Sequence, residues 1–342
     1  MHALQRLLFL AIVCAGLFAS AIGNVSAQSN TAAEETVRAV EQILKGVISS
    51  GGEQPAGESS GDGAEPAEGG QAAESQAPSA SVPPPDPDAP PIPGRLYARL
   101  TEEAGALGSG VRWRVYRAAP EADGSFMTVA SSEEPQPVIN VAPGDYVAVA
   151  IYGHAVASRK ITVANEPFRE AVTLNAGGLR LTSQDSTGKA LPPKSVKLSV
   201  YSAEQDEFGQ RKLVAENAEP GRVMVLNAGS YHIVSQYGDA NSAVRDDVKV
   251  EPAQLTDARI THTAAAITFK LVNEAGGEAL ANTAWSILSQ GGDVVKESYG
   301  AFPTHILAAG DYSVIARHEN NIYNREFSVQ PGLPRDIEVV AQ

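Results

Sequence analysis

The sequence predicts an all-β protein, built from three tandem antiparallel β-sandwiches that follow a signal peptide, one short helix and a disordered linker. Three observations support this prediction. Apolar and polar residues alternate with a period of two in many short runs after residue 94. Turn-forming residues separate these runs at the spacing found in sandwiches. A Gly-x-Tyr motif occurs three times, at intervals of 85 and 81 residues.

The first 27 residues have the pattern of a secretory signal peptide. Arg6 precedes an uncharged apolar run over 7–19, and Val25-Ser26-Ala27 fits a small-x-small cleavage site. The apolar run is shorter than the roughly 20 residues that span a bilayer, which disfavours an uncleaved N-terminal anchor. A lipoprotein signal acylated at Cys14 is a second alternative, but too little apolar sequence precedes this cysteine. Cleavage after Ala27 predicts a periplasmic or secreted protein.

Removal of this segment would leave 315 residues and no cysteine. It takes away one of the 26 basic residues and no acidic one, so the formal charge changes from −14 to −15. A chain without thiols has neither disulfides nor thiolate metal sites, although an exported protein meets an oxidising compartment. The excess of negative charge argues against nucleic acid as a partner.

Residues 28–50 carry the pattern of one short amphipathic helix. Thr31 and Glu34 have the spacing of a capping box, and Gly51 supplies a stop. Because an isolated helix of this length is marginal in water, its apolar stripe needs a cover. Self-association through residues 31–49, docking on a partner and packing back on the chain are the three alternatives. The stripe consists of Val37, Val40, Leu44 and Val47.

Residues 51–93 form a low-complexity linker made largely of Pro, Ala, Gly, Glu and Ser. Such a composition cannot bury enough apolar surface to offset the cost of ordering. The Gly/Ser-rich first half is expected to be flexible and the Pro-rich second half extended. Residues 28–93 hold eleven acidic and two basic residues, so most of the negative charge belongs to a solvated tether.

From residue 94 onward three units align on one another. Their predicted boundaries are 94–176, 177–264 and 265–342. The third unit contains about seven strand-like runs in 78 residues, and the repeat period suits one small domain per unit. Period-two alternation without a convincing helix indicates an antiparallel β-sandwich in each unit. Trp113 and Trp285 take inward positions in their strands.

The Gly-x-Tyr motif stands at the start of an alternating strand in each unit. The glycine allows a tight turn with positive φ, and the tyrosine is expected to bury its ring and bond its hydroxyl near the sandwich edge. The tyrosine face points inward, because the other face carries Gln236 and Arg317, which are costly to bury. The motif residues are Gly144, Tyr146, Gly229, Tyr231, Gly310 and Tyr312.

The signature Leu/Val-x-Ala-Gly-x-Tyr-x-Val before an alternating strand resembles bacterial immunoglobulin-like and carboxypeptidase-regulatory-like (prealbumin-type) sandwich modules. The resemblance covers residues 94–342, although Pro143 replaces the alanine of the signature in the first unit. It implies an exported tandem-repeat protein and leaves the choice between the two strand topologies open. Such modules occur as spacers, adhesin stalks, sugar-binding accessories and appendages of enzymes, so no single function follows.

The sequence contains no pattern that singles out a catalytic residue, a metal site or a cofactor site. The histidines after residue 27 show neither the i,i+4 spacing of metal ligands nor a His-Glu-x-x-His motif. A Gly-x-Ser-x-Gly elbow is absent from the sequence. Asp246 and Asp247 point to opposite faces of one strand. The acidic groups at 86–88 and 121–124 lack the further ligands of a calcium site.

The loops that follow the three tyrosine strands are candidate binding loops. If the repeats stack with a regular rotation, these loops recur along the molecule and could contact a carbohydrate or protein partner. Capping of the core is the alternative, favoured by the inward parity of the tyrosines at 152 and 237. The residues concerned are Tyr152, His154, Arg159, Tyr237, Asp239, Arg245, His318, Asn320 and Arg325.

Short connections between the units favour an elongated rod. We therefore expect an exported, non-catalytic structural or interaction protein that binds or positions a protein partner in the cell envelope. A carbohydrate-binding or adhesive cell-surface module is the alternative, weakened by the inward tryptophans, since sugar sites usually expose an aromatic platform. A secreted enzyme with a site between repeats is the reserve hypothesis. The expected partner is a protein or polysaccharide of the cell envelope.

Overall fold

The computed structural model describes residues 90–342. The predicted signal peptide (1–27), helix (28–50) and all but the last residues of the predicted linker (51–93) lie outside the described residues. The first strand begins at Ile92, so the end of the predicted linker is strand.

The described residues are almost entirely β-structure. They form 21 strands and one three-residue 3₁₀ turn, η1 (Pro193–Ser195). Seven consecutive strands make up each unit, so the prediction of tandem β-sandwiches is confirmed. The units are called repeats 1, 2 and 3 below.

Repeat 1 consists of two sheets. Its strands are β1 (Ile92–Arg99), β2 (Val111–Arg117), β3 (Thr128–Ser132), β4 (Val138–Val141), β5 (Gly144–Tyr152), β6 (Ala155–Val163) and β7 (Phe168–Thr173). One sheet has the order β4-β1-β7 and the other the order β3-β2-β5-β6. Alternating residues from both sheets meet in a core that contains Trp113, which is 1% exposed.

Repeats 2 and 3 have the same two-sheet plan. The strands of repeat 2 are β8 (Ala176–Asp185), β9 (Val196–Gln205), β10 (Arg211–Ala215), β11 (Val223–Asn227), β12 (Gly229–Tyr237), β13 (Ala243–Val250) and β14 (Leu255–His262). Those of repeat 3 are β15 (Ala264–Val272), β16 (Ala284–Ser289), β17 (Val294–Tyr299), β18 (Thr304–Ala308), β19 (Gly310–His318), β20 (Asn321–Val329) and β21 (Arg335–Val340). The sheet orders are β11-β8-β14 with β10-β9-β12-β13, and β18-β15-β21 with β17-β16-β19-β20.

One strand pair in each repeat is parallel, and it joins the first strand to the last. These pairs are β1 with β7, β8 with β14, and β15 with β21; the other pairs are antiparallel. In the constant-type immunoglobulin sandwich the first strand lies beside the second. Here the first strand lies between the fourth and the seventh, so the strand order differs from that arrangement.

Each repeat has its own apolar core. The core of repeat 3 contains Trp285, 1% exposed, whose ring lies 5.7 Å from that of Phe269. The indole N–H of Trp285 donates to the Gly300 carbonyl at 2.8 Å, which satisfies the polar atom of a buried aromatic ring. The inward placement predicted for both tryptophans is confirmed.

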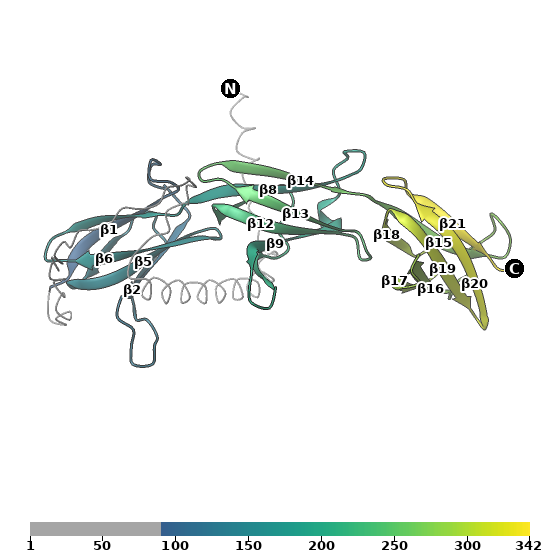
Figure 1. Ribbon diagram of the computed structural model, residues 1–342, viewed down its shortest axis with the longest axis horizontal. Helices are drawn as coiled ribbons and strands as arrows, with labels where there is room; N and C mark the ends of the chain where they lie inside the picture. Colours follow the sequence, from purple (N-terminus) through teal and green to yellow (C-terminus); the bar gives the residue numbers. More distant parts are fainter. Residues whose placement is uncertain (1–89) are drawn as a thin grey trace, which may run out of the picture.

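The three repeats follow one another along the long axis of the molecule (Figure 1). Only Leu174 and Asn175 separate β7 from β8, and only Thr263 separates β14 from β15. Such connections leave little freedom between neighbouring sandwiches. Within residues 90–342 no helix is long and apolar enough to cross a membrane.

Candidate functional site at the joints between repeats

The Gly-x-Tyr motif builds a hydrogen-bonded corner in all three repeats. The glycines at its start have φ between 151° and 153°, a backbone conformation that favours glycine. Each tyrosine hydroxyl donates to the main-chain carbonyl four residues earlier. The pairs are Tyr146 with Ala142 at 2.8 Å, Tyr231 with Asn227 at 2.8 Å, and Tyr312 with Ala308 at 2.9 Å. Burial raises the pKa of Tyr146 and of Tyr231.

This corner fixes the end of the fourth strand of the repeat, namely β4, β11 or β18. The tyrosine strand then runs the length of the repeat and ends in a hairpin loop at the opposite end. The loop of repeat 1 reaches β11 of repeat 2, and the loop of repeat 2 reaches β18 of repeat 3. The candidate binding loops of repeats 1 and 2 therefore contact the next repeat.

Joint 1, between repeats 1 and 2, includes four hydrogen bonds made by the loop of repeat 1 or by the Asn227 side chain. The main-chain N–H of His154 donates to the Val225 carbonyl at 3.0 Å. The Asn227 side chain accepts from the Val156 N–H at 3.1 Å and donates to the carbonyls of Val156 at 3.1 Å and Leu174 at 2.8 Å. One asparagine of repeat 2 thus binds both the loop of repeat 1 and the connection.

Joint 2, between repeats 2 and 3, also depends on an asparagine of repeat 2. Asn241, in the loop between β12 and β13, accepts from the Ala308 N–H at 3.1 Å. Its amide group donates to the Tyr312 hydroxyl at 2.8 Å. Because that hydroxyl itself donates to the Ala308 carbonyl, the corner of repeat 3 is part of the joint.

An ion pair adds to joint 2. The Asp239 carboxylate lies 2.7 Å from the Lys296 ammonium group and 3.6 Å from Nδ1 of His305. The hydrogen bond from Lys296 is the main cause of a lowered pKa at Asp239, and the charge of His305 acts in the same direction. Joint 1 depends on neutral hydrogen bonds, so the two joints differ in their electrostatics.

Glycine allows the close approach at both joints. Gly153 and Gly238 have φ of 63° and 73°. A Cβ at Gly153 would lie 3.1 Å from the Val225 Cβ, and one at Gly238 only 2.5 Å from the Ile306 Cβ. The equivalent position in repeat 3 is Glu319, with φ of 53°.

The remaining candidate loop residues do not gather into one site. Arg159 pairs with Glu170 at 3.2 Å and donates to the Ala171 carbonyl at 3.1 Å. Arg325 donates to the Glu338 carbonyl. These two arginines therefore tie the sixth strand of their repeats to the seventh, whereas Arg245 is exposed on β13.

In the third loop, Nδ1 of His318 lies 3.5 Å from the Thr283 hydroxyl, and Asn320 is exposed. Tyr152 is partly buried and packs against the core of repeat 1. Ring packing in repeat 2 involves Tyr237, which meets the His262 ring edge-on at 5.6 Å.

His262 anchors the base of the joint 2 loop. Its Nε2 lies 2.8 Å from the Ser235 hydroxyl and its Nδ1 lies 3.0 Å from the Ser242 hydroxyl. Both serines and the histidine are buried, and burial lowers the pKa of His262. Because substrate cannot reach a serine with 0% exposure, this group holds the loop in place and does not form a nucleophilic site. No cluster of metal-ligating side chains occurs within the described part of the chain.

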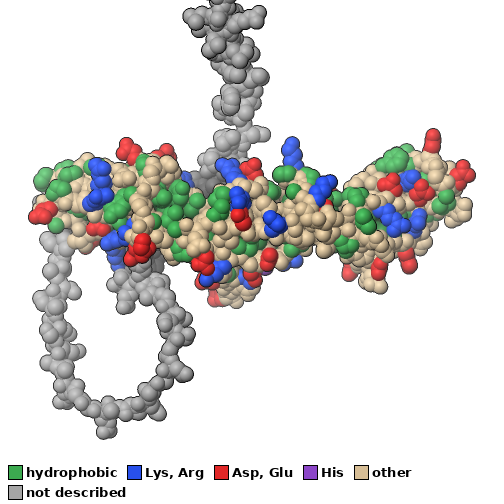
Figure 2. Space-filling view, turned by 90° about the horizontal axis from the view of Figure 1, so that it is seen from above, with side chains coloured by type: hydrophobic (Ala, Val, Ile, Leu, Met, Phe, Trp, Pro, Cys, Tyr) green, Lys and Arg blue, Asp and Glu red, His purple; other side chains and the backbone are tan. Residues whose placement is uncertain are grey.

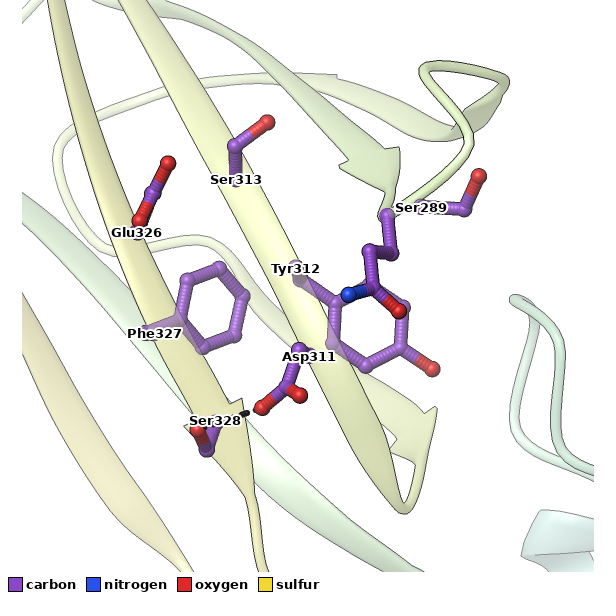
Figure 3. A pocket seen from close by; sticks show the side chains of 8 residues that line it. Ser289, Asp311, Tyr312, Ser313, Glu326, Phe327 and Ser328 are labelled. Atoms are coloured by element: carbon purple, nitrogen blue, oxygen red, sulfur yellow. Dashed lines mark hydrogen bonds between the residues drawn. The ribbon is translucent and has the colours of Figure 1, made fainter.

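A surface pocket of about 400 Å³ lies on repeat 3, at the start of β19 and the end of β20 (Figure 3). Its Asp311 accepts a hydrogen bond from the Ser328 hydroxyl at 2.6 Å. The same bond joins Thr162 to Asp145 in repeat 1 at 2.7 Å, so this carboxylate has a structural partner. The lining residues are Ser289, Gln290, Asp311, Tyr312, Ser313, Glu326, Phe327 and Ser328.

Sequence reasoning missed the residues that make the joints, above all Asn227, Asn241 and Lys296. One signal was present. Asn227 stands two residues before the motif glycine, where the other two units have alanine. The sequence thus sets repeat 2 apart at this position, although it does not show which group the asparagine binds.

Residues 266–341 match the model of a family described as the Rhizobiales growth-associated tandem repeat domain. This stretch is repeat 3, so the match covers one of the three sandwiches. No curated protein matches the chain.

Several solved structures are similar to the chain at low identity. The Bacillus anthracis TIE protein is 15% identical, with 74% of this chain and 50% of that chain covered and a TM-score of 0.24. This chain thus spans half the length of that protein. A streptococcal ancillary pilin is 14% identical over 74% of this chain and 99% of its own, with a TM-score of 0.25. The minor pilin of Streptococcus agalactiae is 12% identical over 50% and 95%, with a TM-score of 0.28.

Proposed function

We propose that this protein is an exported, non-catalytic spacer, whose tandem sandwiches form a stiff rod that holds or positions a protein partner in the cell envelope. The single observation that carries the proposal is the pair of bonded joints. Loops that would be free to bind a ligand in an isolated sandwich are used to fix the next sandwich in line. Signal cleavage after Ala27, and hence a periplasmic or secreted location, is part of the proposal.

Surface charge supports a structural role. On the face seen in Figure 2, basic and acidic side chains are interspersed along the rod and do not gather in one patch. A surface of this kind suits solubility better than the capture of a strongly charged ligand.

Small-angle X-ray scattering on the purified mature chain tests the rod. We expect a distance distribution with the long tail of an extended body, unchanged over a series of salt concentrations. A compact distribution, or one that fits freely jointed domains, would contradict the proposal.

Partner binding needs a separate experiment in cells. Photo-crosslinking residues placed at exposed positions of repeat 3 and of repeat 1 are expected to capture a defined envelope protein from one end of the rod. Insertion of a further copy of repeat 2 is expected to leave crosslinking to that envelope protein intact. It is expected to impair the function of the protein in cells, because the rod becomes longer. If the longer rod functions normally, spacing is not its role.

Exposed aromatic side chains on repeat 3 favour carbohydrate binding as a second candidate function. Tyr299 is the last residue of β17 and Phe302 lies in the connection to β18; their exposed fractions are 67% and 62%. Aromatic faces of this kind stack on sugar rings. Co-sedimentation with purified cell-wall sacculi tests this candidate. Sedimentation of the parent chain and its loss in Y299A/F302A would favour it over the spacer, whereas F208A, at a distant exposed aromatic residue, serves as the control.

A further inference from the structure

The outer face of the larger sheet in repeat 1 carries a second apolar cluster. Val147, Val149 and Ile151 alternate along β5 with the inward residues of the core and lie on the opposite side of the sheet. Their exposed fractions are 0%, 0% and 2%, and together with Tyr116 they form a cluster separate from the core of repeat 1.

Repeats 2 and 3 have polar side chains at most of the same places. Counted from the motif glycine, the equivalents are His232, Val234 and Gln236 in repeat 2, and Ser313, Ile315 and Arg317 in repeat 3. All six are partly or fully exposed. An apolar outer face is therefore a property of repeat 1 and not of the sandwich plan.

A middle strand of an open sheet exposes its outer side chains unless another element lies over them. Among the described residues, the partly buried apolar side chains that pack against the cluster are those of Ala118, Phe126 and Val156. The aliphatic side chains are nevertheless buried, so a further segment must cover this outer face of the sheet.

The rim of this face is basic. Arg112, Arg114 and Lys160 are the register partners of Ile151, Val149 and Val147 on the neighbouring strands. In the same register these three cations point to the outer side, beside the aliphatic strip. The face therefore suits the apolar side of an amphipathic helix that is flanked by acidic residues.

We propose that residues 31–49 of the same chain dock as an amphipathic helix on this outer face of repeat 1. These residues lie outside the described part of the chain, and their sequence carries a stripe of four aliphatic side chains at helical spacing. Residues 31–49 hold three acidic and two basic residues, and the linker 51–93 that follows adds eight acidic and no basic ones. The negative charge that complements the basic rim therefore lies mainly in the chain next to the docked helix.

The length of the tether permits this contact. Residues 51–89 connect the segment to the start of repeat 1, and a flexible chain of that length has an end-to-end distance of about 35 Å, at roughly 5–6 Å times the square root of its length. Such a tether gives the helix an effective concentration on the order of 1 mM at repeat 1, so that a helix of even weak affinity is bound most of the time. The sequence leaves three alternatives for the apolar stripe of the helix: self-association, docking on a partner and packing back on the chain. The outer face of repeat 1 favours the third.

Limited trypsin digestion of the mature chain tests the docking, because Arg38 and Lys45 are cleavage sites within the segment. We expect slow cleavage there in the parent chain. Leu44→Glu, in the stripe, is expected to raise the cleavage rate at least tenfold, whereas Gln42→Glu, on the opposite side of the helix with the same added charge, is not. Both substitutions lie outside the sandwiches and leave them folded.

A variant of the face completes the test. Val149→Glu is expected to expose the segment like Leu44→Glu, and Val234→Glu, at the equivalent place in repeat 2, is not. Equal cleavage in the parent and Leu44→Glu would overturn the proposal. Protection that disappears on dilution would also overturn it, since it would assign the segment to a second copy.

Discussion

At the scale of single residues, the tyrosine of the Gly-x-Tyr corner makes different hydrogen bonds in repeats 2 and 3. In repeat 2 the Tyr231 hydroxyl makes one bond, to the Asn227 carbonyl. In repeat 3 the Tyr312 hydroxyl donates to Ala308 and also accepts from Asn241 across the joint. The motif tyrosine therefore contributes more to stability in repeat 3, where it also bonds with the preceding repeat.

Replacement of these tyrosines by phenylalanine separates the two roles. We expect Tyr231→Phe to destabilise repeat 2 by about 1 kcal/mol, the value of one hydrogen bond. Tyr312→Phe is expected to cost more, about 2 kcal/mol, because the Asn241 amide loses its acceptor as well. Calorimetric unfolding of the two variants and the parent measures the difference. Equal costs would show that Asn241 contributes nothing through this hydroxyl.

His262 makes the stability of repeat 2 sensitive to mild acid. Its pKa is lowered by burial, so between the folded-state pKa and the ordinary value of about 6.5 the unfolded chain binds the proton and the folded chain does not. We expect the free energy of unfolding to fall as the pH drops below about 6.5, by at most about 1.4 kcal/mol per pH unit for one proton. Urea unfolding between pH 5 and 7 measures this slope.

The His262→Gln variant is the control, since its amide can hydrogen-bond with Ser235 or Ser242 without titrating. It is expected to lose stability at pH 7 and to show a flatter dependence on pH. A slope as steep as that of the parent would assign the effect to another group.

At the scale of elements, the period-two alternation predicts the strands, and in repeats 2 and 3 it also predicts the inward face of the tyrosine strand. In repeat 1 this strand is apolar on both sides, so its inward face follows only from comparison with the other two repeats. Trp113, Trp285 and the motif tyrosines all take the predicted side. The parallel pairing of the first and last strands could not be predicted in this way, because alternation records which face is buried and carries no information on which strand lies beside which. Pairing over about 75 residues is a property of the whole sandwich.

The candidate binding loops also could not be placed relative to the next repeat from the sequence. The sequence places Tyr152, His154, Tyr237 and Asp239 at the end of a tyrosine strand, and repetition suggests a surface that recurs. What occupies that surface depends on the rotation between neighbouring repeats, which arises from a few contacts such as that of Asn227 with Leu174. An asparagine at a strand end has the appearance of an ordinary turn residue in the sequence.

Asn227→Ala tests the contribution of one element contact to joint 1. Alanine is the residue at this place in the other two repeats, and the corner bond from Tyr231 survives because it uses the main-chain carbonyl. We expect repeat 2 to stay folded while joint 1 loosens, so that the amides of 154–156 exchange hydrogen roughly tenfold faster, as about 1.4 kcal/mol would produce. Amides of the joint 2 loop are the internal reference, and acceleration there as well would mean that repeat 2 itself had been damaged.

At the scale of the whole molecule, the shape of the rod depends on the close approach of one glycine to the next repeat at each joint, Gly153 at joint 1 and Gly238 at joint 2. Neighbouring sandwiches are connected by only one or two residues, so any change at a joint alters the direction of everything beyond it. Gly238 is the more sensitive position, because a side chain there meets the Ile306 Cβ at 2.5 Å and both partners belong to packed strands and loops with little room to shift.

Gly238→Ala is therefore expected to open or bend joint 2 and to change the longest dimension seen by small-angle scattering, with each sandwich still folded by circular dichroism. Gly209→Ala is the matched control, since its φ of 75° imposes the same backbone strain and nothing lies within 4 Å of the added Cβ. Both variants should lose a similar amount of stability from the turn itself. Only the first should alter the shape, because only there does the methyl group occupy the space of the next repeat. If both keep the parent scattering curve, the rod is held by the connections alone and the loops have no part in its stiffness.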